Sequence, residues 1–195
     1  MISKLSNLIT KNLLKRNVIS DNEKELYDYG LFMIISYMVF FLISILFGFV
    51  LDILFSSVLF FICFCLARNF AGGFHAKTEI KCDFITTFLI LISEILIKVF
   101  IVYKLVMIVY IMLLVSSLCL FFIQPVDTSQ KEISCQEKKR FHRKTIIITV
   151  VIIIVSIVSV KLGIYNIIIS LSVGLSLASL LLIMGKLQQF LQGSS

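Results

Sequence analysis

The sequence predicts an all-α protein, a polytopic bundle of membrane helices that forms a single integral membrane domain over residues 1–195. Two features of the composition predict this class: 59% of the residues are hydrophobic and only 15% are charged. A soluble domain usually has about 25% charged residues, and it needs polar side chains to cover its surface. The third feature is that the apolar residues form long runs. We therefore expect a bilayer, rather than water, to surround most of the chain.

Six apolar segments account for the predicted spans. They cover roughly residues 31–50, 53–67, 84–97, 105–123, 145–160 and 164–184. A helix that crosses a bilayer needs about 20 residues, with a range of about 17–25. The second, third and fifth segments are shorter, so their polar flanks are expected at interface depth, and four to six spans are predicted. Helices are favoured over strands because hydrocarbon does not tolerate open sheet edges.

Residues 1–30 form an amphipathic N-terminal region before the first span. Apolar residues recur there at intervals of three and four, with lysines between them: Ile2, Leu5, Leu8, Ile9 and Leu13, with Lys4, Lys11 and Lys15. This pattern predicts a basic amphipathic helix that lies on the inner leaflet of the bilayer. The alternative is an ordinary solvated helix.

The basic residues predict the orientation. Six spans with a cytoplasmic N-terminus place every Lys and Arg on the cytoplasmic side except Lys98, Lys104 and Lys161. The positive-inside rule favours this arrangement. We therefore expect both termini, and the polar loops 68–83 and 124–144, in the cytoplasm.

The loop over residues 68–83 contains one of the two histidines, His75, and one of the five cysteines, Cys82. A cysteine peptidase needs a thiolate, an imidazole that exchanges its proton, and donors for an oxyanion. On one straight helix these two residues would lie about 10 Å apart. The chain must therefore turn between them, and the Gly72–Gly73 pair relaxes the backbone before His75. Cys82 would lie at the N-terminus of the third span, where the helix dipole favours a thiolate. From spacing alone, the alternative that His75 and Cys82 occur together by chance in a membrane-surface loop stays open.

The loop over residues 124–144 contains a second pair with the same spacing, Cys135 and His142. It lacks the glycines, and its basic residues indicate a solvated loop that attracts anionic head groups or an acidic peptide. The residues proposed for such contacts are Lys138, Lys139, Arg140 and Lys144. The histidines and cysteines have no metal-ligand spacing, and topology explains the basic charge. We therefore expect no metal, no cofactor and no nucleic-acid partner.

The segment from Arg68 to Cys82 reads RNFAGGFHAKTEIKC. Its Arg68, Gly72–Gly73 pair, His75 and Cys82 resemble the motif of the accessory gene regulator protein B (AgrB) family. These are membrane-embedded cysteine endopeptidases of Gram-positive bacteria that process the precursors of autoinducer peptides in quorum sensing. The length, the basic N-terminal helix and the clustered spans are also similar, as is the opening of the second polar loop at residues 125–128.

The resemblance implies that Cys82 is the nucleophile, that His75 is the general base and acid, and that Arg68 supports them. In the family, the thiolate attacks the precursor peptide, releases its acidic C-terminal tail and forms a thioester. A cysteine or serine of the precursor then closes a thiolactone or lactone ring. The resemblance also implies a homodimer in the bacterial cell membrane. Our own inference is that Gly72 and Gly73 let the substrate backbone approach.

A third catalytic residue is not identified, although Glu79 and Asp83 lie near Cys82 in the sequence. Glu94, inside the third span, is a candidate substrate-binding group because intramembrane carboxylates are usually functional. Lys98, one turn further on, could instead be its structural partner. Two other function classes therefore stay open. The chain could be a small-peptide transporter with a polar pathway through Glu94, Lys98 and Lys104, or a non-catalytic membrane scaffold.

Overall fold

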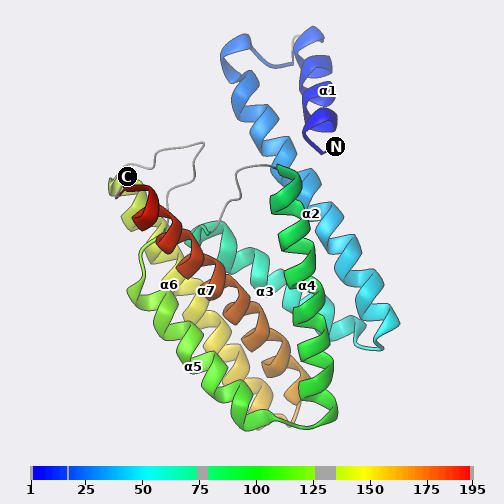
Figure 1. Ribbon diagram of the computed structural model, residues 1–195, viewed down its shortest axis with the longest axis vertical. Coiled ribbons are helices and arrows are strands. Elements are labelled where there is room, and N and C mark those ends of the chain that lie inside the picture. Colours follow the sequence, from blue (N-terminus) through cyan, green and yellow to red (C-terminus); the bar gives the residue numbers. More distant parts are fainter. Residues whose placement is uncertain (1, 17, 74–78, 126–134, 194–195) are drawn as a thin grey trace. The chain divides into compact units, whose positions relative to one another are not determined.

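The computed structural model describes residues 2–16, 18–73, 79–125 and 135–193 (Figure 1). These residues form seven α-helices, and a short 3₁₀ turn at Asp21–Glu23 precedes the second of them. The helices are α1 (Ile2–Lys15), α2 (Lys24–Val50), α3 (Leu54–Ala71), α4 (Glu79–Val102), α5 (Val106–Phe122), α6 (Cys135–Lys161) and α7 (Tyr165–Gly193). The described part of the chain contains no strand, so the all-α prediction is confirmed.

Each of the six predicted apolar segments lies in one of the helices α2–α7. Five of these six are long and apolar enough to cross a membrane. The sixth, α5, has 17 residues, which is the lower limit of the usual range for a span. The shortest apolar helix is therefore α5. The second, third and fifth apolar segments, which are short in the sequence, lie in helices of 18, 24 and 27 residues.

The predicted boundaries were wrong where polar residues flank the apolar segments. Helix α4 begins at Glu79 and has 24 residues, and helix α6 begins at Cys135 and has 27. The polar flanks continue the helices because backbone hydrogen bonding does not require apolar side chains, and Glu, Lys and Arg have good helix propensity. The predicted loop 68–83 is therefore helical at both ends. The predicted loop 124–144 is helical from Cys135 onward.

The chain forms two compact units, Met1–Ile43 and Ser44–Ser195, and the division between them falls inside α2. In the first unit the Thr10 hydroxyl donates a hydrogen bond to Asp28 Oδ1 over 3.3 Å, which joins α1 to α2. Ser6 and Thr10 are buried, whereas Leu5 and Leu8 are 48% and 60% exposed. Helix α1 thus contacts α2 through polar side chains and leaves leucines at its surface, which is compatible with the predicted contact with lipid.

The second unit is built around α7, which packs against α3, α4, α5 and α6 and runs through the middle of the bundle in Figure 1. In the most apolar stretch of α7, 72% of the residues are buried, whereas at most 44% are buried in the corresponding stretch of any other candidate span. Small residues permit this close packing. Gly174 lies directly beside the Phe60 carbonyl of α3, and the Cys63 thiol donates to the Leu171 carbonyl over 3.4 Å.

Three short turns connect the hairpins α2–α3, α4–α5 and α6–α7. Each contains one residue with a left-handed backbone: Asp52 (φ 54°), Lys104 (φ 51°) and Gly163 (φ 74°). These turns lie at one end of the second unit (Figure 1). The end of α3 and the starts of α4 and α6 lie at the opposite end, where the connections are longer. Of the predicted site residues in the segment 68–82, Arg68, Gly72, Gly73 and Cys82 are described, and they belong to that second end.

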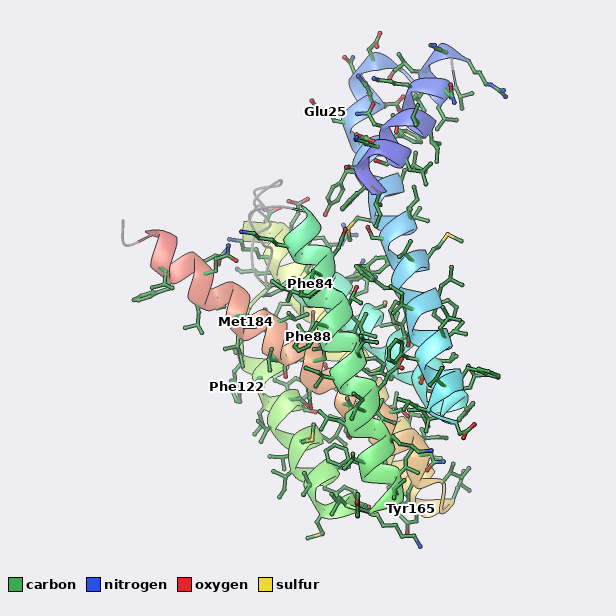
Figure 2. All side chains as sticks on the ribbon, turned by 45° about the vertical axis from the view of Figure 1, so that its right-hand side comes forward. Glu25, Phe84, Phe88, Phe122, Tyr165 and Met184 are labelled. Carbon is green, nitrogen blue, oxygen red and sulfur yellow. The ribbon has the colours of Figure 1, made fainter. Side chains whose placement is uncertain are left out.

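The outer surface of the second unit is apolar to a degree that water would not tolerate. Phe84 and Phe88 project from α4 with 73% and 55% of their surfaces exposed, and Phe122 at the end of α5 is 80% exposed (Figure 2). Large contiguous apolar surface is rare on soluble proteins. Together with the five long apolar helices, this surface identifies a membrane protein.

Candidate functional site

Helix α3 ends in a turn that depends on glycine. The Gly72 amide donates to the Arg68 carbonyl over 3.0 Å, and Gly72 has φ 71° and ψ −157°, a conformation that is essentially restricted to glycine. The next residue, Gly73, is buried against Leu181 of α7. A Cβ added at Gly73 would lie 3.4 Å from the Leu181 Cβ. The chain therefore leaves α3 in a defined direction, along the surface of the central helix.

Arg68 lies in the last turn of α3, and its guanidinium carbon is 5.6 Å from the centre of the Phe64 ring. Phe64 is almost completely buried and stacks on Phe60, with the ring centres 6.2 Å apart. Such a cation–π contact restricts the guanidinium to one region of space. Arg68 is thus held one turn above the buried core, and it is partly exposed at the end of the bundle that carries Cys82.

Cys82 lies in the first turn of α4, which begins at Glu79. It is a free thiol and is partly exposed, and its neighbour Lys81 is exposed. Backbone N–H groups in the first turn of a helix have no partner within the helix. A substrate carbonyl that approaches this thiol would therefore meet backbone donors as well as the sulfur.

His75 lies outside the described residues, between Gly73 and Glu79. The His75–Cys82 pair stays a prediction, as do the supporting roles of Arg68, Gly72 and Gly73.

The basic residues predicted to bind substrate belong to the first turns of α6. Lys139, Arg140 and Lys144 are exposed and Lys138 is partly exposed. Lys144 has a partner, because its ammonium nitrogen lies 5.1 Å from the centre of the Phe70 ring of α3. The basic segment was predicted as a solvated loop, but it is helical, and one of its cations contacts the end of α3.

The competing pair, Cys135 and His142, lies on this same helix. Residues seven apart on a continuous helix are separated by about 10 Å along its axis. A nucleophile and its base must approach to about 3 Å. Positions 135 and 142 of a continuous α6 are therefore too far apart for the contact that a nucleophile and its base require.

Glu94 is completely buried in the second unit. The Ser44 hydroxyl of α2 donates to Glu94 Oε1, and Glu94 Oε2 has no hydrogen-bond partner among the described residues. Lys98 donates instead to the Leu51 carbonyl at the end of α2, over 2.7 Å. Lys98, which the sequence offered as a possible structural partner of Glu94, thus has the Leu51 carbonyl as its hydrogen-bond acceptor. The predicted contact of Glu94 with substrate stays untested, and a substrate would have to open this packing to reach it.

Sequence reasoning missed the aromatic residues that support the site. Phe64 could have been found, because it lies four residues before Arg68 on a predicted helix and so shares its face. The contact of Phe70 with Phe141 could not, because 71 positions of chain separate the two rings and no local pattern relates them.

Comparison with known proteins supports the same identification as the motif. Residues 2–184 match the protein family described as accessory gene regulator B. No curated protein and no solved structure is similar enough to the chain to give a match.

Proposed function

The chain belongs to the accessory gene regulator B family, whose members take part in the processing of autoinducer peptides, and from this premise we propose that it is a membrane cysteine endopeptidase. Its substrate would be the precursor peptide of a quorum-sensing autoinducer. The observation that carries the proposal is the position of Cys82, a partly exposed free thiol in the first turn of α4. That turn lies at the same end of the bundle as the glycine turn that follows α3.

The proposed reaction begins when His75 takes the proton of the Cys82 thiol. The Cys82 sulfur then attacks the scissile carbonyl of the precursor, and backbone N–H groups of the first turn of α4 stabilise the oxyanion. When the C–N bond breaks, His75 returns the proton to the leaving amine, and the C-terminal tail departs. The remaining peptide is bound to Cys82 as a thioester.

Ring closure completes the proposed reaction. The cysteine thiol, or serine hydroxyl, of the precursor attacks the thioester carbonyl, gives its proton to His75 and displaces the Cys82 thiolate. Exchange of a peptide bond for a thioester is uphill, so water must be kept from the intermediate. A site at the membrane surface favours the intramolecular nucleophile by holding the peptide close and by limiting access of water.

The other predicted residues have supporting roles in this proposal. Gly72, which lacks a side chain and is partly exposed, leaves room for the substrate backbone beside the end of α3. Gly73 would fix the path of the chain there, because it is buried against Leu181. Arg68, restrained by the Phe64 ring, would bind a carboxylate or carbonyl of the precursor. The exposed Lys139 and Arg140, with Lys138, would attract the acidic tail and thereby speed encounter. The working unit would be a homodimer.

We place this enzyme in the bacterial cell membrane, with both termini and the site in the cytoplasm. In variants that retain a single cysteine, an impermeant thiol reagent added outside intact cells should label a Lys161→Cys substitution and should not label Cys135. The reason is the distribution of lysine and arginine along the chain. Labelling of position 82 from outside would reverse the orientation and the route of the substrate.

The chemical step is tested by trapping the intermediate. With a precursor whose ring-forming cysteine is changed to alanine, the ring cannot close. The wild-type enzyme should then accumulate a covalent peptide adduct that hydroxylamine removes and that mass spectrometry assigns to Cys82. Release of the tail without any such adduct, under conditions that stop hydrolysis, would contradict the thioester route.

A further inference from the structure

The end of α3 is held against α6 by an aromatic ring and a cation. The Phe70 and Phe141 rings have centres 6.4 Å apart with an angle of 39° between their planes. The ammonium of Lys144 lies 5.1 Å from the centre of the same Phe70 ring. Phe141 and Lys144 are three residues apart on α6, so they lie on one face of that helix. A single face of α6 therefore contacts the Phe70 side chain twice.

Phe70 occupies a sensitive position in the chain. It lies two residues after Arg68 and two before Gly72, in the last turn of α3. The next residue, Ala71, is completely buried, and Gly73 packs against Leu181 of α7. The last turn of α3 is thus restrained by α6 through Phe70 and by α7 just beyond it.

We infer that Phe141 and Lys144 are positioning residues of the peptidase site, which hold Phe70 and thereby the turn that carries Arg68 and leads into Gly72. This inference rests on the proposed function. Lys144 then has a role different from that of the neighbouring basic residues, because the Lys144 ammonium contacts the Phe70 ring of the protein itself. A displaced Phe70 would let the end of α3 move relative to α7, and Arg68 and the glycine turn would move with it.

The first test compares three single variants in precursor processing. Lys144→Gln keeps a long side chain but removes the charge. The kcat should therefore fall about two- to fivefold, the factor that corresponds to a cation–π contact at an exposed site. The KM should be unchanged. Lys144→Arg should restore kcat, because a guanidinium also stacks on aromatic rings. Arg143→Gln is the matched control, since Arg143 is an equally basic and exposed neighbour, and it should leave both constants unchanged.

The second test is a double-mutant cycle with Phe70→Leu. If Lys144 acts through Phe70, the variant with both Phe70→Leu and Lys144→Gln should process the precursor no more slowly than Phe70→Leu alone. The melting temperature of this double variant should likewise be no lower than that of Phe70→Leu, because the effects of substitutions at contacting residues on stability are not additive.

The two readouts separate the possible failures. A Lys144→Gln variant with raised KM, normal kcat and a smaller dependence on salt would identify a substrate-binding cation and overturn the inference. Additive effects of the two substitutions on melting temperature, with cleavage intact, would also overturn it and leave the proposed function standing. Absence of precursor cleavage by the wild-type protein would overturn the proposed function and the positioning role together.

Discussion

Replacement of Cys82 by alanine, or of His75 by alanine, is expected to abolish cleavage of the precursor peptide. The loss should be at least about a thousandfold in kcat, because removing either member of a nucleophile–base pair disables the pair as a unit. Tail release from a purified precursor, followed by mass spectrometry, measures it. Both variants should still insert into the membrane. Cys82→Ala should also keep the melting temperature of the wild type, since Cys82 is only partly buried at a helix end.

The matched controls are Cys135→Ala and His142→Ala, which have the same spacing in the sequence. Helix α6 keeps these two positions about 10 Å apart along its axis, so both variants should cleave at nearly the wild-type rate. Cys82→Ser is a stricter test, because a hydroxyl is a far poorer nucleophile than a thiolate and should not restore ring formation. Cleavage by Cys82→Ala at nearly the wild-type rate would disprove the peptidase assignment.

A large effect on stability is expected at Gly174, where α7 packs against α3. A Cβ added there would lie 2.9 Å from the Phe60 carbonyl oxygen and 3.1 Å from Cys63 Cβ. Because the first of these atoms belongs to the backbone, the two helices would have to separate. Overpacking of this kind costs about 1–3 kcal/mol, so Gly174→Ala should lower the melting temperature of the full-length protein in detergent, and Gly174→Val should lower it further.

Gly30→Ala is the control for this prediction. Gly30 is also helical, in α2, but a Cβ there would meet no atom of the described residues within 4 Å. Alanine has a higher helix propensity than glycine by about 1 kcal/mol, so this variant should be as stable as the wild type or more stable. Equal melting temperatures for Gly174→Val and Gly30→Ala would show that α3 and α7 do not pack as described.

The sequence by itself was sufficient for the number and order of the apolar helices. The runs around residues 31–50 and 164–184 are too long and too apolar for water, and in a bilayer a helix satisfies all backbone hydrogen bonds of such a run within the run itself. The motif from Arg68 to Cys82 was likewise enough to indicate the family, which the match over residues 2–184 confirmed. The ends of the helices were less predictable. Hydropathy reports where hydrocarbon begins, whereas α4 and α6 continue through polar turns at Glu79 and Cys135, because their backbone hydrogen bonds form in either environment.

Only the tertiary structure decided which side chains meet. Glu94 accepts a hydrogen bond from Ser44, and Lys98 donates to the Leu51 carbonyl just after α2, whereas the sequence had left open whether Glu94 and Lys98 pair with each other. The tertiary structure also placed Lys144 over Phe70. Each of these contacts joins different helices, and helical periodicity relates only residues three or four positions apart within one helix. The close approach of α3 and α7 at Gly174 likewise involves residues of two helices, and such packing is a property of the assembled bundle.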